Sequence, residues 1–119
     1  MDSSLSVDPA ALERLHEWGG EELVTKMVQL FLENAPERGR QIRSGVESGD
    51  LKGVERGAHS LKSSAANLGA ESVRSLARVM EEQAERGHAE GLDSLLERLE
   101  AALDHACDEL RRMNSERET

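Results

Sequence analysis

The sequence predicts an all-α protein, and three observations lead to that fold class. Aromatic residues make up only 2% of the 119 residues, with one Phe, one Trp and no Tyr. The apolar residues are mainly Leu, Ala and Val, a set that favours helices over sheets. They recur at steps of three and four, the period of an amphipathic helix. A chain of this length suits a single domain with one hydrophobic core.

The first expected element is a short helix within residues 1–20, which otherwise form an N-terminal arm. Asp8 can cap this helix, and Pro9 suits its first position. Gly19 and Gly20 then end it. We expect this helix to pack across one end of the remaining structure.

The second expected helix begins near Glu21, where acidic residues complement a helix amino terminus. Phe31 lies on its apolar face and is expected to anchor the core. Pro36 either kinks this helix or opens a third one, because proline fits a first turn but clashes inside a helix. That third helix carries Ile42 and Val46.

The central helix is expected from Leu51 to about Leu68, after a stop and a new cap at Gly49 and Asp50. Its apolar residues form one stripe: Leu51, Val54, Ala58, Leu61, Ala65 and Leu68. His59 lies roughly 130° from the middle of that stripe by helical arithmetic. The imidazole is therefore predicted to face water.

Two further helices follow, one ending near Gly87 and one with the most regular apolar stripe of the chain. That last stripe consists of Leu92, Leu96, Leu99, Leu103, Ala106, Leu110 and Met113. Residues 21–113 are then expected to form an antiparallel, up-down-up-down four-helix bundle with the short N-terminal helix as an extra element. Residues 114–119 are polar and expected to fray. We expect a monomer.

Charge and composition narrow the classes of partner. Acidic residues outnumber basic ones by 24 to 15, a formal charge of −9, which disfavours nucleic acid and anionic membranes as partners. No apolar run approaches the roughly 20 residues of a membrane-spanning helix, and the start lacks a basic region followed by an apolar segment. The single cysteine, Cys107, suits a reducing compartment and is predicted to lie beside the core. We expect a cytoplasmic protein.

One outward-facing column of the central helix surrounds the exposed histidine. Besides His59 it contains Lys52, Arg56, Ser63 and Ala66. The small side chains of Ser63 and Ala66 leave room for another protein to approach the imidazole. The basic members, together with Lys62, make the surroundings locally cationic. The pattern predicts an open, basic and nucleophilic site.

Residues 58–70 read Ala-His-Ser-Leu-Lys-Ser-Ser-Ala-Ala-Asn-Leu-Gly-Ala. This stretch resembles the signature of histidine phosphotransfer (HPt) domains of two-component phosphorelays, roughly A-H-x-L-K-G/S-S-A-x-N-L/I-G-A. His59 matches the phosphorylated histidine, and Ser63 stands where the family often has glycine. The resemblance extends outward to Phe31, Ala35, Pro36, Gly49 and Asp50. It implies that His59 accepts a phosphoryl group from a receiver-domain aspartyl phosphate and passes it to another receiver aspartate.

The resemblance also implies the roles of the partners. An unperturbed imidazole is largely uncharged at neutral pH and keeps a lone pair for attack on phosphorus. Phosphoryl transfer otherwise requires alignment and charge neutralisation. By resemblance, the receiver supplies Mg²⁺ and a lysine, so the chain itself needs no cofactor and no metal. The resemblance further implies a carrier without ATP-dependent kinase activity, with response regulator receivers and a hybrid sensor histidine kinase as its expected partners.

Supporting roles fall to the neighbours of His59. Lys62 and Ser63 are candidates to hold phosphoryl oxygens, since both lie within about one helical turn of the histidine. The candidate receiver-docking residues are Lys52, Arg56, Ser63 and Ala66.

Three other functions compete with this one. Two Glu-x-x-His pairs have the spacing of a di-iron bundle site: Glu13 with His16, and Glu85 with His88. Such a site needs two further inward glutamates and ligands deep within the core, whereas both pairs lie near predicted helix ends. By resemblance, histidine kinase dimerisation domains have an acid directly after the histidine and a proline soon afterwards. Here Ser60 follows, and no proline occurs after Pro36. A non-catalytic helical-bundle adaptor remains the alternative, which a phosphorylation assay separates.

Overall fold

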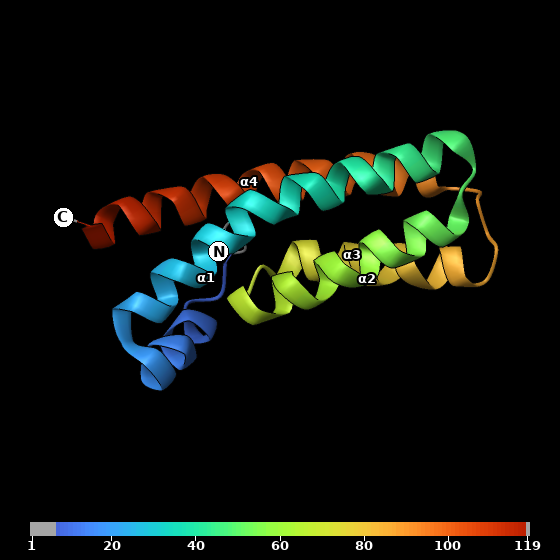
Figure 1. The fold of residues 1–119 in the computed structure, drawn as a ribbon. Coiled ribbons are helices and arrows are strands. Elements are labelled where there is room, and N and C mark those ends of the chain that lie inside the picture. The colour runs from blue at the N-terminus through green and yellow to red at the C-terminus, as the bar shows by residue number, and fades with distance from the viewer. Residues whose placement is uncertain (1–6, 119) are drawn as a thin grey trace.

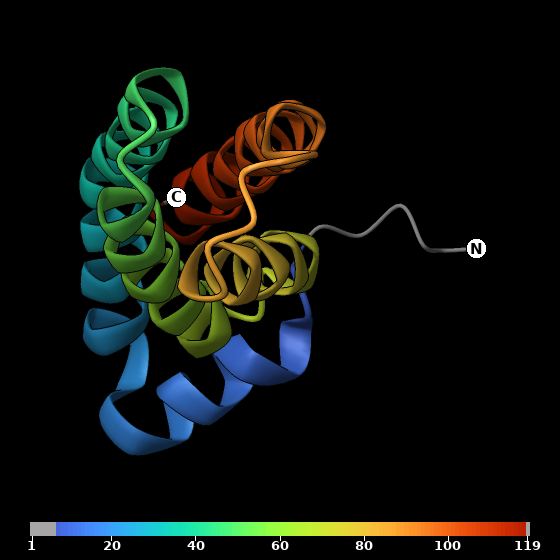
Figure 2. The same ribbon diagram turned by 90° about the vertical axis from the view of Figure 1, so that its right-hand side faces the viewer.

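Four helices form a bundle in the computed structural model, which describes residues 7–118 (Figure 1). They are α1 (Pro9–Ser48), α2 (Leu51–Leu68), α3 (Glu71–Glu85) and α4 (Leu92–Glu118). Each helix packs against the next in the chain, and α4 returns to α1, so that one core is enclosed (Figure 2). The predicted all-α class and four-helix bundle are confirmed. No helix in residues 7–118 combines the length and apolar content needed to cross a membrane.

The short N-terminal helix is the first part of α1. Gly20 has φ 72° and ψ −166°, a conformation that only glycine adopts readily, and the chain turns sharply there. Residues 9–19 therefore lie across one end of the bundle (Figure 2). The predicted cap is present, since the Asp8 carboxylate accepts a hydrogen bond from the Ala10 amide at 3.1 Å. The first six residues of the predicted arm lie outside the described part of the chain.

Of the two alternatives for Pro36, the start of a separate third helix is wrong. After Gly20, α1 continues without any non-helical residue to Ser48, with Pro36 inside it, and the predicted third helix is the second half of α1. An interior proline costs about 3 kcal/mol because one hydrogen bond is lost and the ring crowds the preceding turn. Apolar burial on both sides of Pro36 offsets that cost: Phe31 and Ala35 before it and Ile42 after it are each at most 3% exposed.

Glycines end α1 and α2 as the sequence predicts. Gly49 and Gly69 both adopt left-handed conformations, with φ of 76° and 73°. Asp50 then caps α2, because its carboxylate accepts a hydrogen bond from the Gly53 amide at 3.0 Å. The ends of α2 are therefore fixed by local sequence.

The packing of α2 against α1 depends on two further glycines. A Cβ atom on Gly57 of α2 would lie 2.9 Å from Cγ1 of Ile42, and one on Gly45 of α1 would lie 2.8 Å from Cγ2 of Val54. Any larger residue would force these two helices apart. This close approach fixes the position of α2 relative to the rest of the bundle.

The predicted core of α2 is confirmed. Five of its six stripe residues are at most 1% exposed, and Leu51 is partly buried against the same cluster. Cys107 of α4 also lies at the core as expected, and burial raises the pKa of its thiol.

The predicted fraying of residues 114–119 is wrong for the part that the structure describes. Helix α4 continues through Glu118, and Asn114 is only 7% exposed. Arg117 donates two hydrogen bonds of 2.9 Å to the carboxylate of Glu21, immediately after the Gly20 turn in α1. This ion pair, in which the one nitrogen Nη1 of Arg117 donates to both oxygens of Glu21, is one reason why the end of α4 stays helical. Thr119 lies outside the described residues.

Candidate functional site

His59 lies near the middle of α2 and points away from the core. Its side chain is 61% exposed, whereas Ala58 and Leu61 on the opposite side of the helix are fully buried. The predicted exposure of the imidazole is therefore confirmed. Because α2 is packed on both α1 and α3, a partner would meet this histidine on a rigid element.

A glutamate of α3 connects His59 to Lys62. Oε2 of Glu81 lies 2.7 Å from Nδ1 of His59, and Lys62 donates a hydrogen bond from Nζ to Oε1 of the same carboxylate at 2.8 Å. The Glu81 side chain is 16% exposed and that of Lys62 is 30% exposed. The three residues form a network between α2 and α3, here called the Glu81 network.

Two opposing effects act on the ionisation of Glu81. Its partial burial disfavours the charged carboxylate, but the hydrogen bonds from Lys62 and His59 favour it and outweigh burial. The pKa of Glu81 is consequently lowered from its ordinary value. At neutral pH this residue is an anion that can accept from both neighbours.

The other ring nitrogen of His59 has a different environment. Within residues 7–118, Nε2 has no hydrogen-bond partner. The imidazole therefore offers one nitrogen held by the protein and one open to an incoming group. This arrangement suits a nucleophile that reacts with a group on another protein.

The remaining predicted residues lie along α2 as expected, and Lys62 makes one contact that was not predicted. Lys52, Arg56, Ser63 and Ala66 are all exposed and extend along the same outward face of α2 as His59. Lys62 does not project freely into solvent, because its ammonium group is bound to Glu81. The structure thus gives Lys62 a partner within the domain that the sequence did not suggest.

Sequence reasoning missed Glu81. The available signal is its position in α3 directly after the buried Met80 and three residues before the buried Ala84, at the edge of the apolar stripe. That position predicts a residue near a neighbouring helix. Which residue it meets depends on how α3 is aligned against α2, and no local pattern contains that information.

A groove of about 190 Å³ lies between α1 and α2. Ser64 and Asn67 of α2 line it together with Met27 and Leu30 of α1. Leu30 is 42% exposed, one of two large hydrophobic residues exposed in the described chain. The groove adds apolar surface to the helix that carries His59.

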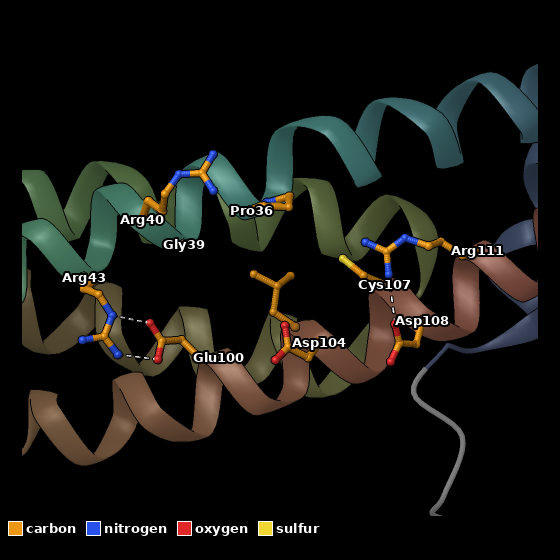
Figure 3. A pocket seen from close by; sticks show the side chains of 10 residues that line it. Pro36, Gly39, Arg40, Arg43, Glu100, Asp104, Cys107, Asp108 and Arg111 are labelled. Atoms are coloured by element: carbon orange, nitrogen blue, oxygen red, sulfur yellow. Dashed lines mark hydrogen bonds and ion pairs between the residues drawn. The ribbon is translucent and has the colours of Figure 1, made fainter.

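A larger groove of about 440 Å³ lies between α1 and α4 (Figure 3). Two ion pairs lie along it: Arg43 donates to both carboxylate oxygens of Glu100 at 2.7 and 2.6 Å, and Arg111 donates to Asp108 at 2.9 Å. Cys107 lines the groove, but the raised pKa of its thiol disfavours the reactive thiolate. In residues 7–118, no three His, Cys, Asp or Glu side chains are placed to hold a metal ion. The α1–α4 groove therefore lacks the reactive group that the α2 face has.

Comparisons with known proteins agree on one family. The family model of the Hpt domain matches residues 26–112. The crystal structure of histidine-containing phosphotransfer protein B (HptB) from Pseudomonas aeruginosa PAO1 is similar with a TM-score of 0.89, over 96% of this chain and 98% of that one, at 24% sequence identity. No curated protein matches the sequence.

Proposed function

The chain belongs to the Hpt domain family and is a histidine phosphotransfer module of a phosphorelay, and we propose that His59 is its phosphorylated residue. In this proposal His59 accepts a phosphoryl group from a receiver aspartyl phosphate and donates it to a second receiver aspartate. The observation that carries the assignment is the geometry of the imidazole, which is 61% exposed on a rigid helix with Nε2 unoccupied by any described residue. These features allow close approach by another protein.

We propose that receiver domains, including that of a hybrid sensor histidine kinase, dock on the face of α2 that carries Lys52, Arg56, Ser63 and Ala66. Small residues leave space beside His59, and the basic residues complement the acidic pocket of a receiver. The chain acts in the cytoplasm as a monomer. It provides no metal or cofactor, and the Mg²⁺ that the transfer requires belongs to the receiver.

The domain acts as a carrier and has no ATP-dependent kinase activity in this proposal. A helical bundle of this size has no glycine-rich loop between strand and helix to cradle phosphates, and the sequence contains no such motif. We expect no heat of binding when ATP is titrated into the isolated protein in a calorimeter. Tight nucleotide binding would contradict the carrier assignment.

The decisive experiment compares two histidine variants. His59→Gln should abolish labelling by a phosphorylated receiver, because the amide cannot form the phosphoramidate. His105→Gln is the matched control, since His105 is also exposed on a helix but lies on α4, and it should be labelled like the parent protein. The label on the parent should be acid-labile, and melting temperatures should barely change for either exposed site.

Two results would contradict the proposal. Acid-labile labelling of His59→Gln would place the phosphoryl group on another residue. Failure of phosphorylated receivers to label the parent protein, with binding intact, would instead favour the adaptor function.

A further inference from the structure

We propose that the groove between α3 and α4 is a docking site for an acidic amphipathic helix of a second protein, and that this site can be occupied while a receiver engages His59. The groove has a volume of about 450 Å³ and is lined by residues of both helices. The docking site itself does not depend on the proposed function of His59. Only its compatibility with a bound receiver does.

The floor of the groove is apolar. Leu76 and Val79 of α3 and Leu95 of α4 line it, and all three side chains are only partly buried. Ser72 and Ser75 of α3 lie beside them and are small enough for another backbone to come close. Covering apolar side chains of this size removes them from water and contributes binding energy. The groove therefore has the apolar half of a docking site.

One charge in the groove has no counterion within the described chain. Arg98 is exposed there, and no carboxylate of residues 7–118 pairs with it. The other charged lining residue, Glu71, is already bound by Arg74 at 2.7 Å. The positions one turn away from Arg98 on its own helix are all uncharged: Ser94, Leu95, Ala101 and Ala102. A partner thus meets one uncompensated guanidinium beside apolar surface.

The groove on the other side of α4 provides a comparison for this arginine. There Arg43 of α1 donates to both carboxylate oxygens of Glu100, so its charge is matched within the domain. Arg98 has no such carboxylate among the residues that the structure describes. A carboxylate supplied by a partner would do for Arg98 what Glu100 does for Arg43. Charge complementarity therefore favours an acidic partner.

The shape of the groove favours a helix as its occupant. The lining residues of α3 run from Glu71 to Val79, which is about 12 Å along the axis at 1.5 Å per residue. Two turns of an amphipathic helix cover that length with apolar residues at i, i+3, i+4 and i+7. An acidic residue beside this stripe can reach Arg98. So short an interface predicts weak and reversible binding.

Helix α3 presents the groove and the Glu81 network on different sides. Glu81 contacts His59 and Lys62 of α2, whereas Leu76 and Val79 line the groove with residues of α4. Helix α3 packs against both neighbours and lies between them (Figure 2). A helix bound in the groove would therefore leave His59 accessible to a receiver.

The first test uses two synthetic probes. One is a helical peptide of about 18 residues with leucines at i, i+3, i+4 and i+7 and glutamates beside them, and the other has lysines in place of the glutamates. In a ¹⁵N NMR titration the glutamate peptide should shift the amide signals of residues 72–79 and 95–98, with a Kd of roughly 10–100 μM. The lysine peptide should bind at least about fivefold more weakly. No shifts in this groove, or equal binding of the two peptides, would overturn the proposal.

The second test reverses the charge in the groove. Arg98→Glu should weaken binding of the glutamate peptide about 5- to 20-fold and strengthen binding of the lysine peptide, a gain that misfolding could not produce. Val79→Ser should weaken both peptides about 3- to 10-fold because an apolar contact is lost. Arg40→Glu makes the same charge change in the α1–α4 groove and is the matched control, which should bind both peptides like the parent. Parent-like binding of the glutamate peptide by Arg98→Glu would contradict the role of Arg98.

The third test asks whether both faces can be used together. Transfer from a phosphorylated receiver should stay within about twofold of the parent rate when the glutamate peptide saturates the groove, because the two faces are separate. A bound peptide that blocks transfer would overturn simultaneous occupancy. If His59→Gln is still labelled, the assignment of the phosphorylated residue fails, whereas the docking site, which is measured by NMR without a receiver, stands or falls on the first two tests.

Discussion

Two glutamates each connect neighbouring helices of this bundle, Glu81 between α2 and α3 and Glu100 between α4 and α1. Glu100 accepts two hydrogen bonds from Arg43, which also donates to Glu47 at 3.0 Å. The hydrogen bond from Arg43 lowers the pKa of Glu100, as the Glu81 network lowers that of Glu81. Both carboxylates are therefore anions held by cations across a helix interface.

The two networks differ in burial and in what they hold. Glu81 is 16% exposed, and burial is the largest single influence on its ionisation, whereas Glu100 is 34% exposed and its hydrogen bond to Arg43 dominates. Glu81 divides its two oxygens between a cation and an imidazole, while Glu100 directs both to one guanidinium (Figure 3). A charged bridge between helices is thus not in itself a functional site. The Glu81 network differs because it holds one nitrogen of the exposed His59 and leaves the other without a partner among residues 7–118.

The largest effect should come from bulk beside His59. Ser63→Trp would set a large ring about one turn from His59 and hold a docked receiver away from the roughly 3 to 3.5 Å approach that transfer needs, so we expect the rate to fall at least about 100-fold. The fold should persist because Ser63 is exposed. Asp104→Trp in the α1–α4 groove is the control and should transfer like the parent in a receiver-to-domain assay. Parent-like transfer by Ser63→Trp would move the docking face elsewhere.

The next effect concerns stability: a glycine-to-alanine change should act differently at the α1–α2 interface and at the α1–α4 interface. Gly57→Ala places a Cβ 2.9 Å from Ile42, so overpacking should lower the free energy of unfolding by about 1–2 kcal/mol despite the better helix propensity of alanine. Gly39→Ala meets only Leu103, at 3.3 Å, and Leu103 borders the open α1–α4 groove and has room to move. We expect this second change to stabilise the protein by up to about 1 kcal/mol. Urea unfolding measures both, and equal effects would contradict the contrast in packing.

A smaller effect is expected from charge on the docking face. Lys52→Glu or Arg56→Glu should slow association with a receiver by a few-fold, because exposed rim charges act mainly on the rate of encounter. The difference from the parent should shrink as salt is added. Arg40→Glu, on the α1–α4 face, is the matched control and should leave association unchanged. Stopped-flow binding at two salt concentrations tests this, and a salt-independent loss would argue against electrostatic docking.

The smallest effect should follow removal of the exposed ion pairs that Arg43 makes with Glu100 and Glu47. Arg43→Met should lower the melting temperature only slightly, since exposed pairs contribute little, and should not change phosphoryl transfer. The pKa of Glu100 is lowered in the folded protein, so its contribution is present above the ordinary glutamate value of about 4.3 and is lost as the pH falls through the folded value. The difference in melting temperature between parent and variant should therefore vanish in acid. A difference that persists at low pH would mean that Arg43 acts by packing.

The sequence by itself determined the helices, most of their ends and the exposure of His59. The stripe of α2, the cap at Asp50 and the stops at Gly49 and Gly69 are set by residues a few positions apart, and an α-helix converts such spacing directly into faces. The direction of His59 follows from the same arithmetic. It was predictable because it depends only on where the core side of its own helix lies.

Only the tertiary structure decided what surrounds that histidine and where helices persist against local signals. Glu81 is 22 residues from His59 in sequence, and their contact depends on the alignment of α3 against α2. The helix through Pro36 and the ordered end of α4 at Arg117 likewise depend on burial and on an ion pair with a distant segment. Local propensities amount to a few kcal/mol at most, so packing between segments far apart in the chain can override them.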